Sequence, residues 1–354
     1  MKTSNNILSK TITLVTFGGL MLFSFFIKGN HLFYFYEQNI FLPYQKFRAI
    51  LLSHISFSLG DILYISIIIG ILIFIVYCII YFKRCLQKKA NWSGFIFPTI
   101  ITILSIYLIY FFSWGANYNR QSIWKPQEEH QWSKDKLVLL NNFLIDKLNS
   151  LEEIPGTYDL STINQEIRTV YQNEYGNKIP YLEVKPSLFS NLIFHLGIQG
   201  YYNPISGEAQ FAKQLPSFMW GFVIAHEMAH QAGIAAEGDA NMMAYVICMK
   251  SKIDHLKYSA YFNLFLYANK ELSKMDSTLA FQKKELLTIS NKNNIEYLKN
   301  LRLQYKSIFR GTVLDIYDWA LKIQGQKQGL NSYNDISRLI YFWEMEGNPK
   351  MKLY

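Results

Sequence analysis

Three long apolar stretches in the first third of the sequence set the strongest limit on what this chain can fold into. They run from about residue 7 to 27, from 59 to 82 and from 94 to 114. Each is as long as the roughly 20 residues that a helix needs to cross a bilayer. We therefore expect three transmembrane helices, and the 115–354 region that follows them is long enough to form its own core.

A cleaved signal peptide is the alternative for the first stretch, in which Lys10 is the only charge. No A-x-A-like cleavage site follows it. The region where such a site would lie is instead filled by bulky side chains, those of Phe23, Phe25, Phe26 and Ile27. We therefore expect an uncleaved membrane anchor.

The loop between the second and third stretches predicts the orientation in the membrane. It carries four cations and no acid within seven residues: Lys83, Arg84, Lys88 and Lys89. Cytoplasmic loops are enriched in lysine and arginine, so this loop and the N-terminus are expected inside. Everything after Trp114 then lies on the outer side of a cytoplasmic membrane.

The connection between the first two stretches is rich in aromatic residues. In the expected orientation it lies outside, although it contains Lys28, Lys46 and Arg48. Its aromatic residues include Phe33, Tyr34, Phe35, Tyr36, Tyr44 and Phe47. Apolar and aromatic segments of this kind lie in the plane of the membrane interface, so we expect an interfacial segment at about 31–55.

The net charge of +9 comes almost entirely from the apolar region. Residues 1–114 contain nine lysines and arginines against two acids, whereas residues 115–354 contain 26 against 24. The excess therefore flanks the expected spans. No basic groove interleaved with aromatics is apparent, so nucleic acid is not an expected partner.

The three cysteines do not form a metal-binding or disulfide pattern. None forms a CxxC pair, and only Cys248 lies in the polar region. A disulfide within that region is excluded, and a cysteine-based zinc site is not expected. The sequence leaves the oligomeric state open.

The polar region has the pattern of a mainly α domain. Ser133, and Asp159 or Ser161, are expected to cap helices that run to about Asn149 and Tyr175. Residues 200–211 predict a β-hairpin around a Pro/Ser/Gly turn. Further helices are expected from Pro216 onward and at about 237–253, 256–272, 291–309, 311–323 and 333–346. The predicted organisation is a membrane region, 1–114, and a helical domain with a small sheet, 115–354.

A metal-binding motif, HExxH, lies at residues 226–230, within the apolar helix that is expected from Pro216 to a break at Gly233. His226 and His230 are four residues apart, so they share one face of a helix and can bind one zinc ion. Glu227 can then take a proton from a water molecule that zinc activates. The alternative is a pair of hydrogen-bonded core histidines and a surface glutamate.

A catalytic zinc site needs a third protein ligand and one open position. Glu237 is the main candidate, because Gly233 can reverse the chain between it and His230. Asn241 shares the helical face of Glu237 and can orient a ligand imidazole. Asp239 is the rival ligand. Glu237 and Asp239 could also simply complement the helix dipole.

The motif followed by E-x-x-A-N resembles the gluzincin pattern of zinc metallopeptidases, in which the glutamate is the third ligand. The whole chain resembles a narrower bacterial membrane family with three spans, known as domain of unknown function 3810. The segments that carry this resemblance are Trp114–Arg120, Lys185–Ser190, Gly200–Ala209, His226–Asn241 and Gly325–Tyr333. The connection before Glu237 is shorter than in gluzincins, which keeps Asp239 open as the third ligand.

The resemblance implies a zincin-like zinc metallopeptidase anchored in the bacterial inner membrane. The lipid bilayer and a peptide or membrane-associated protein substrate are the expected partners. Two alternatives remain: a non-catalytic zinc-binding scaffold of the cell envelope, and a zinc amidase that acts on cell-wall material. The number of protein ligands separates the first of these from an enzyme, because a structural site is closed.

Three further assignments concern residues around the expected centre. In zincins an edge strand binds the substrate backbone, and residues 207–212 are the candidate here, with an ordinary turn as the alternative. Candidates for stabilising the oxyanion are His195, His255, Tyr317 and Tyr333, among which the sequence does not choose, and a structural role is the favoured interpretation of each. Asp61 is interpreted as a charge at the start of a helix.

Overall fold

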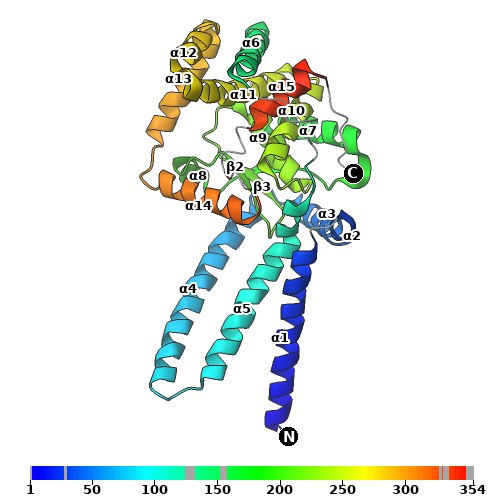
Figure 1. The fold of residues 1–354 in the computed structure, drawn as a ribbon, viewed down its shortest axis with the longest axis vertical. Coiled ribbons are helices and arrows are strands. Elements are labelled where there is room, and N and C mark those ends of the chain that lie inside the picture. The colour runs from blue at the N-terminus through cyan, green and yellow to red at the C-terminus, as the bar shows by residue number, and fades with distance from the viewer. Residues whose placement is uncertain are drawn as a thin grey trace.

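The computed structural model describes residues 2–27, 30–122, 124, 132–151, 158–326, 329 and 335–347. Long helices extend from one side of a helical domain that is built around a small sheet (Figure 1). This arrangement agrees with a mainly α fold that carries a short hairpin.

The long helices are α1 (Lys2–Phe26), α4 (Leu59–Leu86) and α5 (Trp92–Ser113). Both α4 and α5 are long and apolar enough to cross a membrane, and the most apolar part of α4 has no buried residue. In α1 the described apolar stretch is Lys10–Ser24, which is shorter than the roughly 20 residues that a span needs. Of the three expected spans, two are therefore matched by helices in the described part of the chain, α4 and α5.

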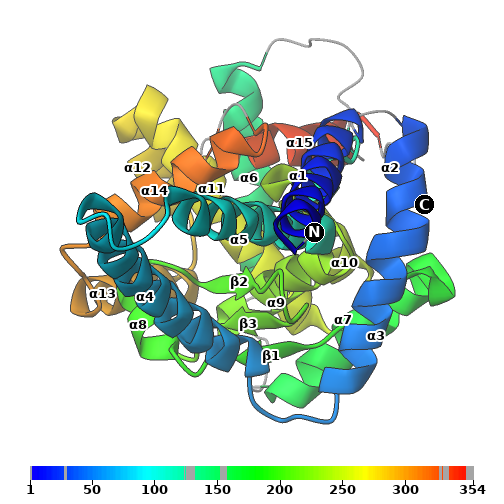
Figure 2. The same ribbon diagram turned by 90° about the horizontal axis from the view of Figure 1, so that it is seen from below.

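The connection between α1 and α4 folds as helices that lie crosswise to the long helices (Figures 1 and 2). They are α2 (Asn30–Tyr36), the π-helical turn η1 (Glu37–Phe41) and α3 (Leu42–Leu52). Apolar side chains on both sides of η1 are exposed, among them Tyr34, Phe35, Phe47, Ile50 and Leu51. Tyr36, Phe41 and Leu52 are buried. This one-sided exposure is what an interfacial segment requires, and its membrane contact stays a prediction.

The sheet has the strand order β1–β3–β2. Strand β1 is Val184–Pro186, β2 is Gly200–Tyr202 and β3 is Ala209–Phe211. Strands β2 and β3 are antiparallel, which confirms the predicted hairpin, while β1 is parallel to β3. Because β3 is central, the prediction that residues 207–212 form an edge strand is wrong. Strand β2 is the edge on that side of the sheet.

Helices surround this sheet. Two predicted caps are confirmed, since the side chains of Ser133 and Asp159 accept hydrogen bonds from the backbone of Lys136 and Thr162. The remaining helices are α6 (Lys134–Ser150), α7 (Leu160–Tyr175), α8 (Ser190–His195), α9 (Ser217–Gln231), α10 (Glu237–Lys250), α11 (Asp254–Met275), α12 (Ser277–Glu285), α13 (Ile289–Gln304), α14 (Arg310–Ile323) and α15 (Asp335–Met345), with short 3-10 turns η2 (Gly115–Asn119) and η3 (Gly176–Lys178).

Helix α9 lies at the centre of the domain. It is apolar around most of its circumference, as expected of a helix covered on all sides. Helices α10 and α11 and the sheet pack against it, and Met219, Phe222, Ile224 and Met228 are almost completely buried. A side chain on α9 is therefore held by a rigid, fully packed element.

The start of α4 is fixed to the sheet by two buried carboxylates. Asp61, in the first turn of α4, accepts hydrogen bonds from the Leu188 backbone N–H at 2.6 Å and from the hydroxyls of Ser187 and Tyr201. Glu208 accepts a hydrogen bond from the Gly60 N–H at 2.6 Å. The position of Asp61 agrees with its interpretation as a helix-start charge. Its contacts to the domain were not predicted.

Candidate metal centre

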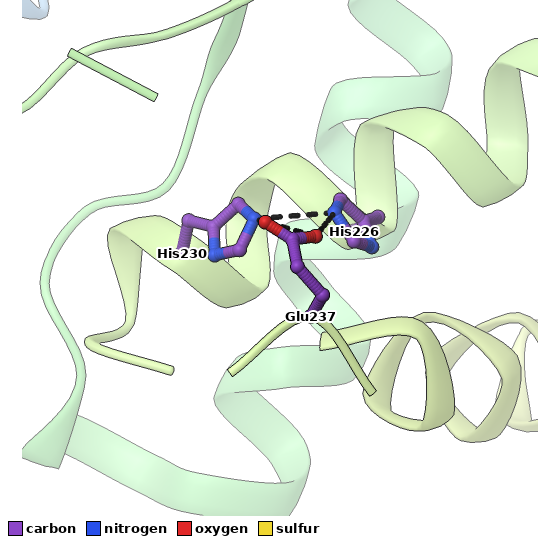
Figure 3. A group of neighbouring side chains, drawn as sticks. All are labelled: His226, His230 and Glu237. Atoms are coloured by element: carbon purple, nitrogen blue, oxygen red, sulfur yellow. Dashed lines mark hydrogen bonds and ion pairs between the residues drawn. The ribbon is translucent and has the colours of Figure 1, made fainter. Parts of the chain in front are cut away.

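Two short pieces of backbone bring the predicted ligands together. His226 and His230 lie one turn apart on α9. Gly233 ends this region with φ +88°, and the Ile234 N–H donates to the Ala229 carbonyl as in a Schellman motif. Only glycine adopts this φ without strain. The chain therefore reverses and α10 begins at Glu237, facing the two imidazoles (Figure 3).

The three facing atoms form a compact triangle. The two Nε2 atoms of His226 and His230 are 3.1 Å apart. Glu237 Oε2 lies 3.2 Å from His226 Nε2 and 3.8 Å from His230 Nε2. Ligands about 2.0–2.1 Å from a tetrahedral zinc ion are about 3.3 Å from one another. The donor types and their spacing therefore fit zinc.

Hydrogen bonds orient two of these three side chains. His230 Nδ1 lies 2.7 Å from the Ile234 carbonyl oxygen, so this nitrogen donates and Nε2 keeps its lone pair toward the centre. The Tyr317 hydroxyl of α14 donates to Glu237 Oε1 at 2.6 Å. This leaves Oε2 as the oxygen that faces the histidines.

Asn241 lies one turn after Glu237 on α10 and is completely buried. Its amide interacts with His226, but neither the amide nor His226 Nδ1 makes a hydrogen bond of standard geometry to the described residues. The contact between Asn241 and His226 is therefore looser than the hydrogen bond between His230 Nδ1 and the Ile234 carbonyl oxygen. Asn241 is adjacent to the ligand that it was predicted to orient.

The charges of the metal-free centre follow from burial and from proximity. Burial lowers the pKa of His230 to about 4, so this imidazole is neutral, as a ligand must be. Burial also lowers the pKa of His226, but Glu237, Glu227 and Asn241 raise it by more. The pKa of Glu237 is lowered despite its burial, because both imidazoles and the Tyr317 hydroxyl stabilise the carboxylate. The neighbouring carboxylates thus favour the protonated form of His226.

Glu227 is buried beside this triangle without being part of it. Among the described residues, its Oε2 has no hydrogen-bond partner. A Cβ atom on Gly200 of strand β2 would lie only 2.5 Å from its Oε1. Burial raises the pKa of Glu227 to about 8, with His226 lowering it and Glu237 raising it further. A buried carboxyl group with a free oxygen is suited to accept and release a proton.

The raised pKa of Glu227 predicts a pH dependence of the metal-free fold. Between the ordinary value of 4.5 and about 8, the folded protein binds more protons than the unfolded chain. The free energy of unfolding therefore falls as the pH rises through this window, by up to about 1.4 kcal/mol per pH unit. Glu227→Gln should remove this slope and raise the thermal midpoint of chelator-treated protein at about pH 8.5 more than at about pH 5. Equal pH dependence of both proteins contradicts this assignment.

The other candidate residues lie apart from the triangle. Among the described residues, Asp239 does not belong to the three-donor group, and it accepts a hydrogen bond from the Ser122 hydroxyl at 2.7 Å. His195 Nδ1 lies 2.8 Å from the Asn191 carbonyl oxygen, and His255 Nε2 lies 3.0 Å from that of Ser217. Tyr333 is outside the described residues.

Two neighbours of the centre could not be assigned from the sequence. Tyr317 was a candidate for oxyanion stabilisation, but its hydroxyl is bound to Glu237. Gly200 lies in a segment that the family resemblance includes, but its close approach to Glu227 was not foreseen. The absence of a side chain at a strand position is the signal that could have indicated such an approach.

The fold and the site together define a mainly helical protein with apolar helices long enough to cross a membrane and a buried His-His-Glu group. Residues 36–341 match the family described as "Protein of unknown function (DUF3810)". The chain belongs to this family. No match was found among curated proteins or among solved structures.

Proposed function

We propose that this protein is a membrane-anchored, zinc-dependent hydrolase that cleaves peptide bonds. The observation that carries this proposal is the triangle of His226, His230 and Glu237, with a carboxyl oxygen of Glu227 beside it that has no hydrogen-bond partner in the described part of the chain. Three protein ligands leave a fourth position for water or substrate, as in catalytic zinc sites.

The membrane placement follows from the long helices. Helices α4 and α5 span the bilayer, and we propose α1 as the third span because it runs along the same side of the domain (Figure 1). The loop after α4 contains Lys88 and Lys89. This cationic loop lies in the cytoplasm by the positive-inside rule, which puts the domain on the outer side of a bacterial cytoplasmic membrane.

Each residue of the centre then has a role that its contacts support. His226, His230 and Glu237 hold the metal, and Tyr317 fixes which oxygen of Glu237 does so. A bound zinc ion supplies Lewis acidity, which makes water easier to deprotonate and a carbonyl easier to attack. Glu227 accepts the proton from the attacking water and passes it to the leaving amine.

The edge of β2 supplies a place for an extended substrate. The residues that flank β2 are hydrogen-bonded toward the β3 side of the sheet. The Gln199 carbonyl accepts from the Ala212 N–H, and the Asn203 N–H donates to the Glu208 carbonyl, both at 2.8 Å. By the alternation of an antiparallel ladder, Gly200 and Tyr202 direct their N–H and C=O groups to the free edge. A peptide that pairs there by strand addition runs next to Glu227.

The test is metal analysis combined with hydrolysis by wild-type protein in lipid nanodiscs. We expect one zinc ion per chain and cleavage of an unstructured polypeptide that stops on chelation and returns with zinc. Bound zinc with cleavage of cell-wall peptides alone identifies an amidase, and bound zinc without hydrolysis identifies a scaffold. Protein purified without chelators that contains no stoichiometric metal overturns the proposal.

Gly200→Ala tests the close approach of β2 to Glu227. The added Cβ would lie 2.5 Å from Glu227 Oε1 and 2.9 Å from the Gln210 carbonyl oxygen, so the carboxyl group must move. Displacement of a catalytic group by about 1 Å can cost about 100-fold in rate, and we expect a loss of about 10- to 100-fold. Zinc content should be unchanged.

Gly311→Ala is the matched control for Gly200→Ala. Gly311 lies in α14, and no atom lies within 4 Å of the added Cβ. This variant should hydrolyse peptides at the wild-type rate. Full activity of Gly200→Ala shows that β2 does not constrain Glu227.

A further inference from the structure

Helix α14 presents an exposed apolar face. Five apolar residues are each between 59% and 89% exposed, and we call them the α14 face. They are Ile308 and Phe309, which directly precede the helix, and Ile316, Trp319 and Ile323 within it. From Phe309 onward they recur at spacings of three to seven residues, which places them on one side of the helix. Asp315 and Lys322 are also exposed and border this strip beside Trp319, from which they are four and three residues away. The apolar exposure is therefore concentrated on one strip of the surface.

The position of α14 relates this strip to the long helices. Gln324, which directly follows α14, donates a hydrogen bond to the Tyr110 hydroxyl at 2.9 Å. Tyr110 lies in the last turn of α5. That end of α5 is the one that meets the domain (Figure 1). Helix α14 lies crosswise at this level (Figures 1 and 2). Its C-terminal end is thus fixed at the level where the proposed span emerges from the membrane.

A second exposed apolar segment lies at the same junction. Helices α2 and α3, with Phe35 and Phe47 among their exposed residues, run on the other side of α5 and α1 from α14 (Figure 2). One flat partner that begins where α5 ends would cover both segments. Tryptophan and other large apolar side chains are enriched at that depth of a bilayer.

We propose that α14 lies in the membrane–water interface with the α14 face in the lipid. The occupant is the leaflet on the domain side, contacted at the boundary between headgroups and acyl chains. This inference rests on the proposed membrane placement of α4 and α5, and it does not depend on the proposed chemistry. Helix α14 also carries Tyr317, whose hydroxyl orients Glu237. Contact of α14 with the lipid therefore fixes the position of this hydroxyl relative to the bilayer surface.

Spin labels at single cysteines in nanodiscs test this inference. Cys78 and Cys85 are replaced by alanine, while Cys248 remains because it is completely buried and burial raises the pKa of its thiol. Labels are placed at Trp319→Cys, with Ile316→Cys as a second position on the same face. Collisions with oxygen, which dissolves in lipid, are compared with collisions with a water-soluble nickel chelate.

We expect an oxygen-to-nickel accessibility ratio that is several-fold higher at residues 319 and 316 than at a label on Gln282→Cys, with a depth of about 5–10 Å. Gln282 is an exposed residue of α12, a helix on the far side of the domain from the long helices (Figure 1). A label on Ile73→Cys, near the middle of α4, reports whether the span is in the bilayer. If the Ile73→Cys label is in lipid while the labels at 319 and 316 behave like the label at 282, the inference about α14 is wrong and the spans stand. Labels at 319 and 316 shielded from both reagents indicate a protein partner, which also overturns it. If the Ile73→Cys label is in water, the membrane placement fails and α14 fails with it.

Discussion

Glu227→Gln should retain one zinc ion per chain and hydrolyse peptides at least about 100-fold more slowly than the wild type. The amide has nearly the size of the carboxyl group but cannot accept the proton of the attacking water. Glu227 is not one of the three clustered ligand residues, so the substitution leaves these intact. The measurement is zinc content by elemental analysis beside the rate of peptide cleavage on the same sample.

Glu183→Gln is the matched control for this prediction. Glu183 is another carboxyl group whose pKa is raised by burial, and it precedes β1. Its substitution changes the same chemical group and should leave both zinc and activity in place. If Glu227→Gln loses its zinc together with its activity, Glu227 helps to hold the metal. If it keeps full activity, its role as a general base is wrong.

Local patterns in the sequence were sufficient to predict the elements that carry the proposed ligands. The four-residue spacing of His226 and His230 requires only that residues 217–231 form a helix, and they do so in α9. The glycine after them predicted the reversal, and Gly233 has the positive φ that a reversal needs. The hairpin at 200–211 likewise depends on turn residues within the segment itself.

The contacts of the centre depend on long-range packing, which the sequence patterns do not report. Tyr317 is 80 residues from Glu237, and its hydroxyl reaches the carboxylate only because α14 folds back beneath the domain. The order of the strands in the sheet also depends on long-range packing. Strand β1 adds to β3 in parallel from outside the hairpin, and this converts the predicted edge strand into the central one.

Membrane placement shows how far composition alone can go. Length and apolar composition identify α4 and α5, but the described apolar part of α1 is too short to qualify by the same criterion. Asp61 was assigned to a helix start from its position in the sequence. Its contacts with Ser187 and Leu188 could not be foreseen, because they depend on where the sheet docks.

Glu237→Gln should lower zinc affinity more than about 100-fold, whereas Asp239→Asn should leave it unchanged. Loss of a residue that merely orients a ligand costs about 10- to 100-fold in affinity, so loss of a direct ligand should cost more. Both substitutions exchange a buried carboxylate for an amide in the first turn of α10, and they differ only in position. Glu237 Oε2 faces both imidazoles, while Asp239 accepts a hydrogen bond from Ser122. The measurement is competition with a chromophoric zinc chelator.

Two further variants place this result on a scale of metal affinity. His226→Ala removes an imidazole ligand and should lose zinc and hydrolysis together, as Glu237→Gln does. Tyr317→Phe removes only the hydroxyl that donates to Glu237 Oε1 at 2.6 Å. The zinc affinity of this variant should fall by about 10- to 100-fold, to a value between the zinc affinities of wild type and Glu237→Gln. If Asp239→Asn releases the metal and Glu237→Gln retains it, the third ligand is Asp239. The Glu237 carboxylate then serves only to balance the charge of His226, and α10 must rotate to bring Asp239 toward the two histidines.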